Sequence, residues 1–215
     1  MSGLVSALDE LAAEDVAGMG DEQTLDRTAL LVAARNRIDA ELTRTVRHGE
    51  MTQAAERDGL KSMRSWLIGH QRSSANDASK IVRASRVLEH FPRVADGFAA
   101  GDISAAQVEV IADAVGPREL AQAAEQGIDL SGFDADWARV GRESPHGSLT
   151  IAVAAFKAAL DPDGPEPDPT EGRRLSIVKH ADGSISGRFD LDAVGGEKVQ
   201  AAIESQVQAL SLIHI

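Results

Sequence analysis

The chain has no cysteine and no tyrosine, and aromatic residues make up only 3% of its 215 residues. Without cysteine it forms no disulfide, offers no thiolate nucleophile and supplies no cysteine ligand for zinc. Alanine, leucine, valine and isoleucine provide most of the apolar side chains, a composition that favours closely packed helices over sheets. The sequence therefore predicts a mainly α protein, and the lack of disulfides fits a cytoplasmic location.

Signals for export and for membrane insertion are also missing. Residues 1–26 carry seven acidic and no basic side chains, whereas a secretory signal begins with positive charge followed by an apolar run. The most apolar helical stretch, residues 149–160, contains Lys157 and is shorter than the roughly 20 residues that cross a bilayer. We expect no membrane partner.

Charge is unevenly distributed along the chain. The net charge is −12, yet residues 27–93 hold 13 basic and 7 acidic side chains, a local net charge of +6. Salt screens exposed charges from one another beyond about 8 Å, so the basic segment can present its own surface to a polyanion. A nucleic-acid contact is therefore expected within residues 27–93.

Composition and periodicity predict four regions. The linker among them packs four prolines and five acidic residues into twelve positions, a composition that cannot build a core. After it, Asp182-Gly183 stands between two alternating segments and predicts a tight β-hairpin, and Asp192 is placed to cap a final helix. The regions are an acidic N-terminal segment (1–23), a helical domain (24–160), the acidic proline-rich linker (161–172) and a β-hairpin plus helix (173–215).

Within the helical domain, apolar residues at three- and four-residue steps predict a long helix from Thr24 to His48, which Gly49 ends. A short helix over residues 62–69 and a helix that Ser74 caps then form a helix-turn-helix-like unit. On the second of these helices, the basic and apolar side chains separate onto opposite faces at 100° per residue. The basic face carries Lys80, Arg83 and Arg86.

The order of residues over this region resembles the bacterial family called domain of unknown function 222 (DUF222), and the likeness covers most of residues 25–210. Proteins similar to this one commonly carry an HNH nuclease domain after the final helix, in which a histidine and a divalent metal ion cleave a phosphodiester. The resemblance therefore implies an N-terminal region of an HNH endonuclease-type protein. It depends on Asp58-Gly59, Ser62, Trp66-Leu67, Ser74, Ala78, Val82, Leu88, Pro92, Gly101 to Ser104, Val108, Ile111-Ala112 and the hairpin with Ser186 to Asp190.

The HNH segment itself is missing from the sequence. Residues 210–215 resemble the translated end of a transposon used in sequencing libraries, and no glycine, asparagine or proline ends the preceding helix. We therefore expect the chain to be truncated before the HNH domain. The divalent metal is expected only in that domain, and this chain is expected to need no cofactor.

No catalytic or metal-binding residue is assigned. None of the six histidines has a second histidine or a carboxylate at a metal-site spacing on one helix face or hairpin. Glu56 and Asp58 offer no paired geometry with a histidine for acid and base work. Trp66 is interpreted as a core anchor rather than a base-stacking residue, and Asp190 with Asp192 as a strand end and a helix cap rather than a metal pair.

Two functions remain open from the sequence. In the first, the chain is a non-catalytic domain that binds DNA or positions the nuclease on it, with Arg72, Lys80, Arg83 and Arg86 contacting phosphates. The alternative is that these four side chains are simply exposed to solvent on the outer face of a helix. In the second, residues 24–48, with Leu30, Leu31 and Ile38, form a protein interaction or homo-oligomer surface without nucleic-acid binding. The intact parent resembles an endonuclease, but this chain is expected to be non-catalytic.

Overall fold

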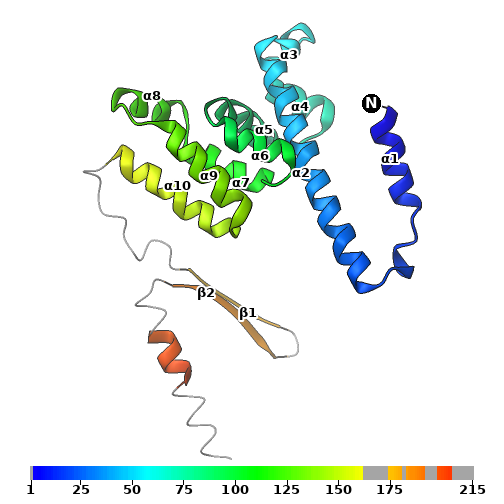
Figure 1. Cartoon of the computed structure of the whole chain (residues 1–215), viewed down its shortest axis with the longest axis vertical. Coiled ribbons are helices and arrows are strands. Elements are labelled where there is room, and N and C mark those ends of the chain that lie inside the picture. Colours follow the sequence, from blue (N-terminus) through cyan, green and yellow to red (C-terminus); the bar gives the residue numbers. More distant parts are fainter. Residues whose placement is uncertain (1, 162–173, 181–182, 192–197, 205–215) are drawn as a thin grey trace, which may run out of the picture. The chain divides into compact units, whose positions relative to one another are not determined.

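Helices dominate the computed structural model, which describes residues 2–161, 174–180, 183–191 and 198–204 (Figure 1). The chain divides into two units, Met1–Pro162 and Asp163–Ile215, and the boundary between them falls inside the predicted acidic linker. The second unit contains a two-stranded antiparallel hairpin and a helix at residues 198–204. The mainly α fold with a small β-hairpin and a following helix is confirmed.

The helices of the first unit begin largely where cap residues predict. The hydroxyls of Ser62, Ser74 and Ser104 each accept a hydrogen bond from the backbone amide three residues ahead, the usual N-cap arrangement. The elements are α1 (Ser2–Ala13), η1 (Val16–Gly18), α2 (Asp21–Met51), α3 (Ala54–Arg57), α4 (Met63–Gln71), α5 (Ala75–Val87), η2 (Leu88–His90), α6 (Pro92–Ala100), α7 (Ala105–Ala114), α8 (Pro117–Glu125), α9 (Leu130–Glu143) and α10 (His146–Leu160).

The N-terminal region differs from the sequence prediction. The predicted long helix starts three residues earlier than Thr24 and ends two residues after Gly49, and most of the acidic segment 1–23 is itself helical as α1. Asp21 and Glu22 occupy the first turn of α2, where the positive end of the helix dipole favours carboxylates. The segment that was described only by its acidic composition therefore contains a helix.

Most of the apolar interior of the first unit gathers around one indole. Trp137 of α9 is 1% exposed, its ring lies 4.9 Å from Phe91 and 5.6 Å from Phe156 between centroids, and its N–H donates to the carbonyl of Ala152 at 3.3 Å. Few aromatic residues therefore suffice, because they are concentrated where α6, α9 and α10 meet. A second, smaller cluster joins α2, α4 and α5 through Val46, Leu67, Ala78 and Val82.

Polar contacts fix α2 and α9 against α6. The Asn36 amide donates to the carbonyl of Gly101 at 3.0 Å, and Gly101 has a φ of 93° with its missing Cβ only 2.7 Å from the carbonyl oxygen of Ala33. Only glycine accepts that close approach at a positive φ. The buried carboxylate of Asp134 accepts the amides of Arg93 and Val94 at 2.9 and 3.0 Å, capping α6 from another helix.

The second unit contains the predicted hairpin. Strands β1 (Arg174–Lys179) and β2 (Ile185–Asp190) pair antiparallel, with Arg174 opposite Asp190 and Lys179 opposite Ile185. Gly183 lies in the turn with a φ of 85°, as a tight hairpin turn requires. Asp182, Asp192 and residues 210–215, on which three sequence predictions depend, lie outside the described residues.

Candidate functional site

The segment predicted to be helix-turn-helix-like contains two helices, α4 and α5, joined by Arg72, Ser73 and Ser74. Arg72 ends α4 in the left-handed region with a φ of 56°, and its side chain is exposed and forms no ion pair with any described residue. The second helix, α5, contacts α2, α4 and α7. It is the central helix of this part of the fold rather than a free recognition helix.

Two of the predicted phosphate-binding side chains form ion pairs with carboxylates of α7. The Lys80 ammonium lies 2.8 Å from a carboxylate oxygen of Glu109, and the Arg83 guanidinium lies 2.8 Å from one of Asp113. The hydrogen bond to Glu109 raises the pKa of Lys80. Because α7 supplies a carboxylate for each cation, the basic face of α5 is neutralised across the helix interface.

The third cation of α5 is held by α2. Arg86 Nε donates to Glu50 at 3.1 Å, and this contact raises the pKa of Arg86. Arg47 contacts the same carboxylate at 3.5 Å and makes two shorter hydrogen bonds, of 2.6 and 2.7 Å, to Glu89 of η2. The Glu50 carboxylate therefore lies between two guanidiniums and joins α2, α5 and η2 in one charge network.

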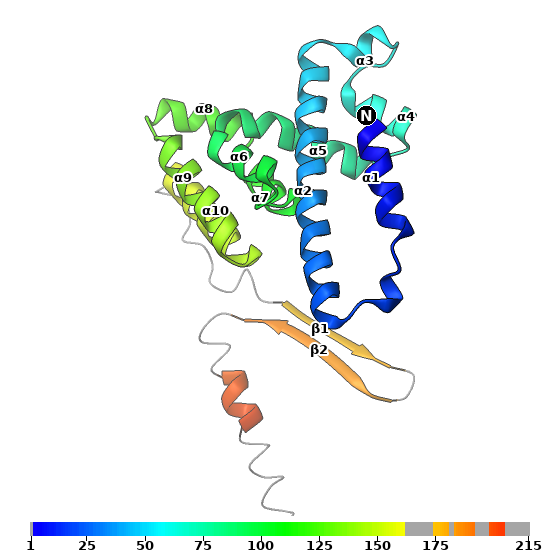
Figure 2. The same cartoon turned by 45° about the vertical axis from the view of Figure 1, so that its right-hand side comes forward.

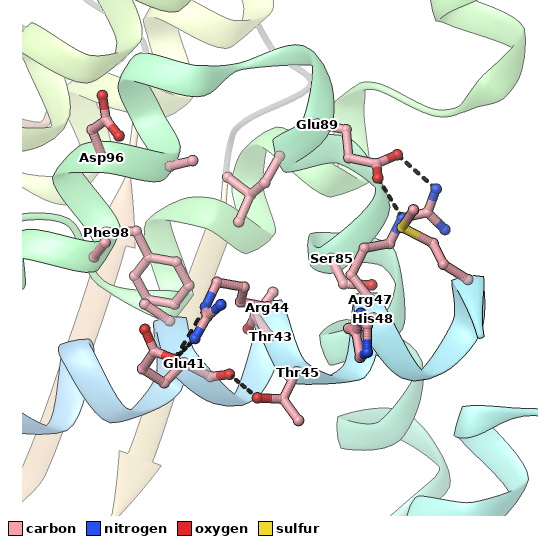
Figure 3. A pocket seen from close by; sticks show the side chains of 15 residues that line it. Glu41, Thr43, Arg44, Thr45, Arg47, His48, Ser85, Glu89, Asp96 and Phe98 are labelled. Carbon is pink, nitrogen blue, oxygen red and sulfur yellow. Dashed lines mark hydrogen bonds and ion pairs between the residues drawn. The ribbon is translucent and has the colours of Figure 1, made fainter. Parts of the chain in front are cut away.

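Beside this network lies an open hollow of about 680 Å³ between α2, α5, η2 and α6 (Figure 3). Arg47 and Glu89 face each other at its rim, and Arg44 pairs with Glu41 at 2.6 Å. The apolar part of its lining comes from Ala40, Met51, Leu88, Ala95, Phe98 and Ala99. The hollow can accept an apolar group, but its rim cations already have carboxylate partners.

Asp58, Trp66 and His70 form a cluster that the sequence analysis missed. The Trp66 indole N–H donates to Asp58 Oδ2 at 2.9 Å, and His70 Nε2 lies 3.6 Å from the same oxygen. The Trp66 and His70 rings stack with centroids 5.5 Å apart. Asp58 therefore lies close to a histidine in space, because Asp58 lies outside α4 and the turn at Gly59 returns the chain beside it.

The Asp58 and His70 side chains of this cluster are 56% and 50% exposed. Trp66 packs partly against the smaller apolar cluster, so its predicted anchoring role holds for part of the ring. Within the described ranges, no group of three histidine, cysteine, aspartate or glutamate side chains is arranged to hold a metal ion. In the same residues every buried side-chain nitrogen and oxygen has a hydrogen-bond partner.

Among the described residues, none of the helices combines the length and the apolar composition that a membrane span requires.

The first unit exposes many apolar side chains on α1 and on α2 between residues 25 and 42. Arg27 is what ties the two helices together, through an ion pair with Glu14 and a 2.9 Å hydrogen bond to the carbonyl of Leu11. α1 and the start of α2 lie away from the α6–α10 core (Figures 1 and 2). We call their exposed apolar side chains the hairpin surface, which consists of Leu4, Val5, Leu8, Leu25, Leu30, Leu31, Val32, Ile38 and Leu42.

Comparison with known proteins places the chain in a family without assigning it an activity. No curated protein and no solved structure matches it. A family model described as a domain of unknown function matches residues 25–213, which includes α2 to α10, the hairpin and residues 198–204. The chain belongs to the DUF222 family.

Proposed function

We propose that this chain is a non-catalytic protein-interaction module that docks its partner on the hairpin surface. One observation carries the proposal: leucine, isoleucine and valine side chains remain exposed over α1 and α2, which the contacts of Arg27 connect, including Leu25 at 71% and Leu8 at 50%. Single exposed apolar residues are ordinary. Contiguous apolar patches larger than a few hundred Å² mark interaction sites on monomeric proteins.

The sequence pattern of α2 supports this interpretation. Its buried residues Asn36, Ala40 and Thr43 face the other helices, and the same three- and four-residue steps continue backwards to Val32 and Leu25. A stripe with this period lies on one face of a helix. The apolar stripe therefore continues past the part of α2 that packs against the other helices. The proposal places the partner on this uncovered N-terminal part of the stripe.

The absence of cysteine makes this proposal directly testable, since any introduced cysteine is the only thiol in the chain. Leu8→Cys places a thiol on the hairpin surface, and Ile151→Cys places one on α10, where the native side chain is 75% exposed. The proposal predicts that a maleimide labels Leu8→Cys at least several-fold more slowly than Ile151→Cys in intact cells. Both variants should label at similar rates in unfolded protein, and equal labelling in cells would overturn the proposal.

DNA binding or nuclease positioning stays a second candidate. It is supported by the net charge of +6 over residues 27–93 and by the exposed Arg72 in the turn between α4 and α5. Four phosphate contacts would give a log-log salt slope of about −3.6 for duplex binding. Because Lys80, Arg83 and Arg86 are paired with carboxylates, each would have to leave its partner first, which lowers the expected affinity.

The measurement for this candidate is duplex-DNA affinity between 50 and 200 mM salt. Arg72→Glu combined with Arg83→Glu should abolish binding if the predicted surface is used. Arg118→Glu combined with Arg139→Glu, on α8 and α9 away from the predicted unit, is the control with the same change in net charge. Equal affinity for the two variants would remove α5 from the binding surface.

A further inference from the structure

We infer that the N-terminal part of the hairpin surface binds an amphipathic helix of another protein, whose apolar stripe is flanked by lysine or arginine side chains. The inference rests on the proposed function and names the chemistry of the partner. It follows from the exposed apolar face of α1 and from the charge of the residues that accompany it.

Helix α1 presents an apolar face that the domain leaves open. Leu4, Leu8 and Leu11 follow one another at four- and three-residue steps, a spacing that places them on one side of a helix. Residues 3–13 are all exposed except Leu11, which is half-buried. Leu4 and Leu8 are 47% and 50% exposed. This face is therefore available to another molecule.

The residues around this face carry only negative charge. Residues 1–26 hold seven acidic and no basic side chains. Glu14 pairs with Arg27, and Asp15 caps η1. The remaining carboxylates are exposed and form no ion pair with any described residue; they are Asp9, Glu10, Asp21, Glu22 and Asp26.

Other carboxylates of the first unit are neutralised within the chain. Glu109 and Asp113 of α7 pair with cations of α5, and Glu89 of η2 pairs with Arg47. The unpaired carboxylates of residues 1–26 leave the charge of the hairpin surface uncompensated at this end. Lysine or arginine side chains of a partner would compensate it, whereas an acidic partner or an anionic lipid surface would be repelled.

The spacing of the apolar side chains selects a helix as the partner. Leu31, Ile38 and Leu42 of α2 lie at seven- and four-residue steps and are 38 to 43% exposed, the spacing by which one helix packs along another. The leucines of α1 have the same period. Binding through an amphipathic helix with anchors at this period is a common mode of peptide recognition. A partner helix with basic flanks would match both the apolar and the charged side chains.

The first experiment measures the binding of synthetic peptides to the full chain. The probe is a fluorescent helical peptide with a leucine stripe flanked by lysines, and its control has glutamate in place of every lysine. The lysine peptide should bind at least about tenfold more tightly and should weaken as salt rises from about 50 to about 500 mM. It should protect Leu8→Cys, but not Ile151→Cys, from a maleimide. Equal binding of the two peptides, or equal protection of the two thiols, would overturn the inference.

Variants of the apolar face test whether the peptide uses it. Leu4→Ser combined with Leu8→Ser should weaken binding of the lysine peptide at least about tenfold. Ile151→Ser, at an exposed isoleucine of α10, is the control and should leave the affinity unchanged. Circular dichroism checks that each variant keeps its helical content. Unchanged affinity of the double variant would contradict the inference.

Variants of the charged side chains separate a specific contact from general attraction to an acidic protein. Asp9→Asn combined with Glu10→Gln should weaken binding and reduce its dependence on salt. Glu125→Gln combined with Glu143→Gln removes the same charge from exposed positions of α8 and α9 and should have little effect. Equal effects of the two double variants would mean general attraction and would overturn the inference.

The outcomes also distinguish the inference from the proposed function. If the lysine peptide does not bind but Leu8→Cys is protected in cells, the inference fails and the proposed function holds. If Leu8→Cys is also unprotected, both fail. Protection of Leu8→Cys by phosphatidylcholine vesicles alone would assign the surface to a lipid and overturn the inference.

Discussion

The aromatic core and the hairpin surface use apolar side chains in opposite ways. Around Trp137, side chains from α6, α9 and α10 cover one another, so that Phe91 and Phe156 are fully buried. On α1 and on α2 between residues 25 and 42, leucine, valine and isoleucine side chains remain exposed. The comparison teaches that an apolar stripe on a helix is stabilised when another surface covers it. The topology of the chain decides whether another helix of the same molecule does so.

The largest expected difference between the two regions is in stability. Trp137→Ala removes a fully buried indole from contact with Phe91, Phe133 and Phe156, so unfolding free energy should fall by about 3–5 kcal/mol. Leu31→Ala on the hairpin surface should change the stability of the monomer by less than about 0.5 kcal/mol. Urea unfolding at low protein concentration measures both. Similar losses would show that the hairpin surface belongs to the core.

A smaller loss of stability is expected from the contact between Asp134 and the first backbone amides of α6. Asp134→Asn replaces a carboxylate that accepts two backbone amides with a side chain whose NH2 group faces a donor. The loss should be about 2 kcal/mol. Asp136→Asn, in the exposed pair with Arg139, is the matched control and should have little effect. A neutral Asp134→Asn would mean that the two amides find other acceptors.

A third prediction concerns the charge network that anchors the second half of α2, which the first half lacks. Glu50→Gln leaves Arg47 and Arg86 beside each other without the shared carboxylate. Stability should fall by about 1 kcal/mol, and added salt should shrink the difference because it screens the repulsion. Glu41→Gln, which removes the partner of Arg44, controls for loss of an exposed pair. A salt-independent difference would contradict the electrostatic explanation.

The smallest expected effect is a pH dependence at the rim of the hollow. The hydrogen bonds from Arg47 lower the pKa of Glu89 below its ordinary value of 4.5. A carboxylate whose pKa is lowered by folding stabilises the native state above that ordinary value, and the contribution disappears as pH falls through the native pKa. Glu89→Gln should therefore cost less than about 1 kcal/mol at pH 7 and less still at pH 3. Urea midpoints at both pH values test this, and an increasing difference at low pH would refute the sign.

Local signals predicted much of the fold correctly. Ser74 caps α5 as expected, because capping needs only a hydroxyl and an amide three residues away. The hairpin between β1 and β2 follows from alternation and a turn glycine. The sequence analysis assigned no helix to residues 1–23, although Leu4, Leu8 and Leu11 follow a helical spacing in α1.

The candidate site was less predictable. The four cations were identified by sequence spacing, but Glu109 and Asp113, which neutralise Lys80 and Arg83, belong to a helix some thirty residues further along. The pairing of Asp58 with His70 likewise depends on the turn between α3 and α4. These contacts depend on how whole helices pack, and no local pattern encodes the distance between two helix faces.

The sequence by itself determined the helical class, the helix starts, the β-hairpin and the separation of basic and apolar faces on α5, since each depends on residues within a few positions of one another. Only the tertiary structure decided which apolar stripes are covered and which cations are free. Burial and ion pairing depend on segments distant in sequence, and they paired the cations on the basic face of α5 with carboxylates of α2 and α7 while leaving the hairpin surface exposed.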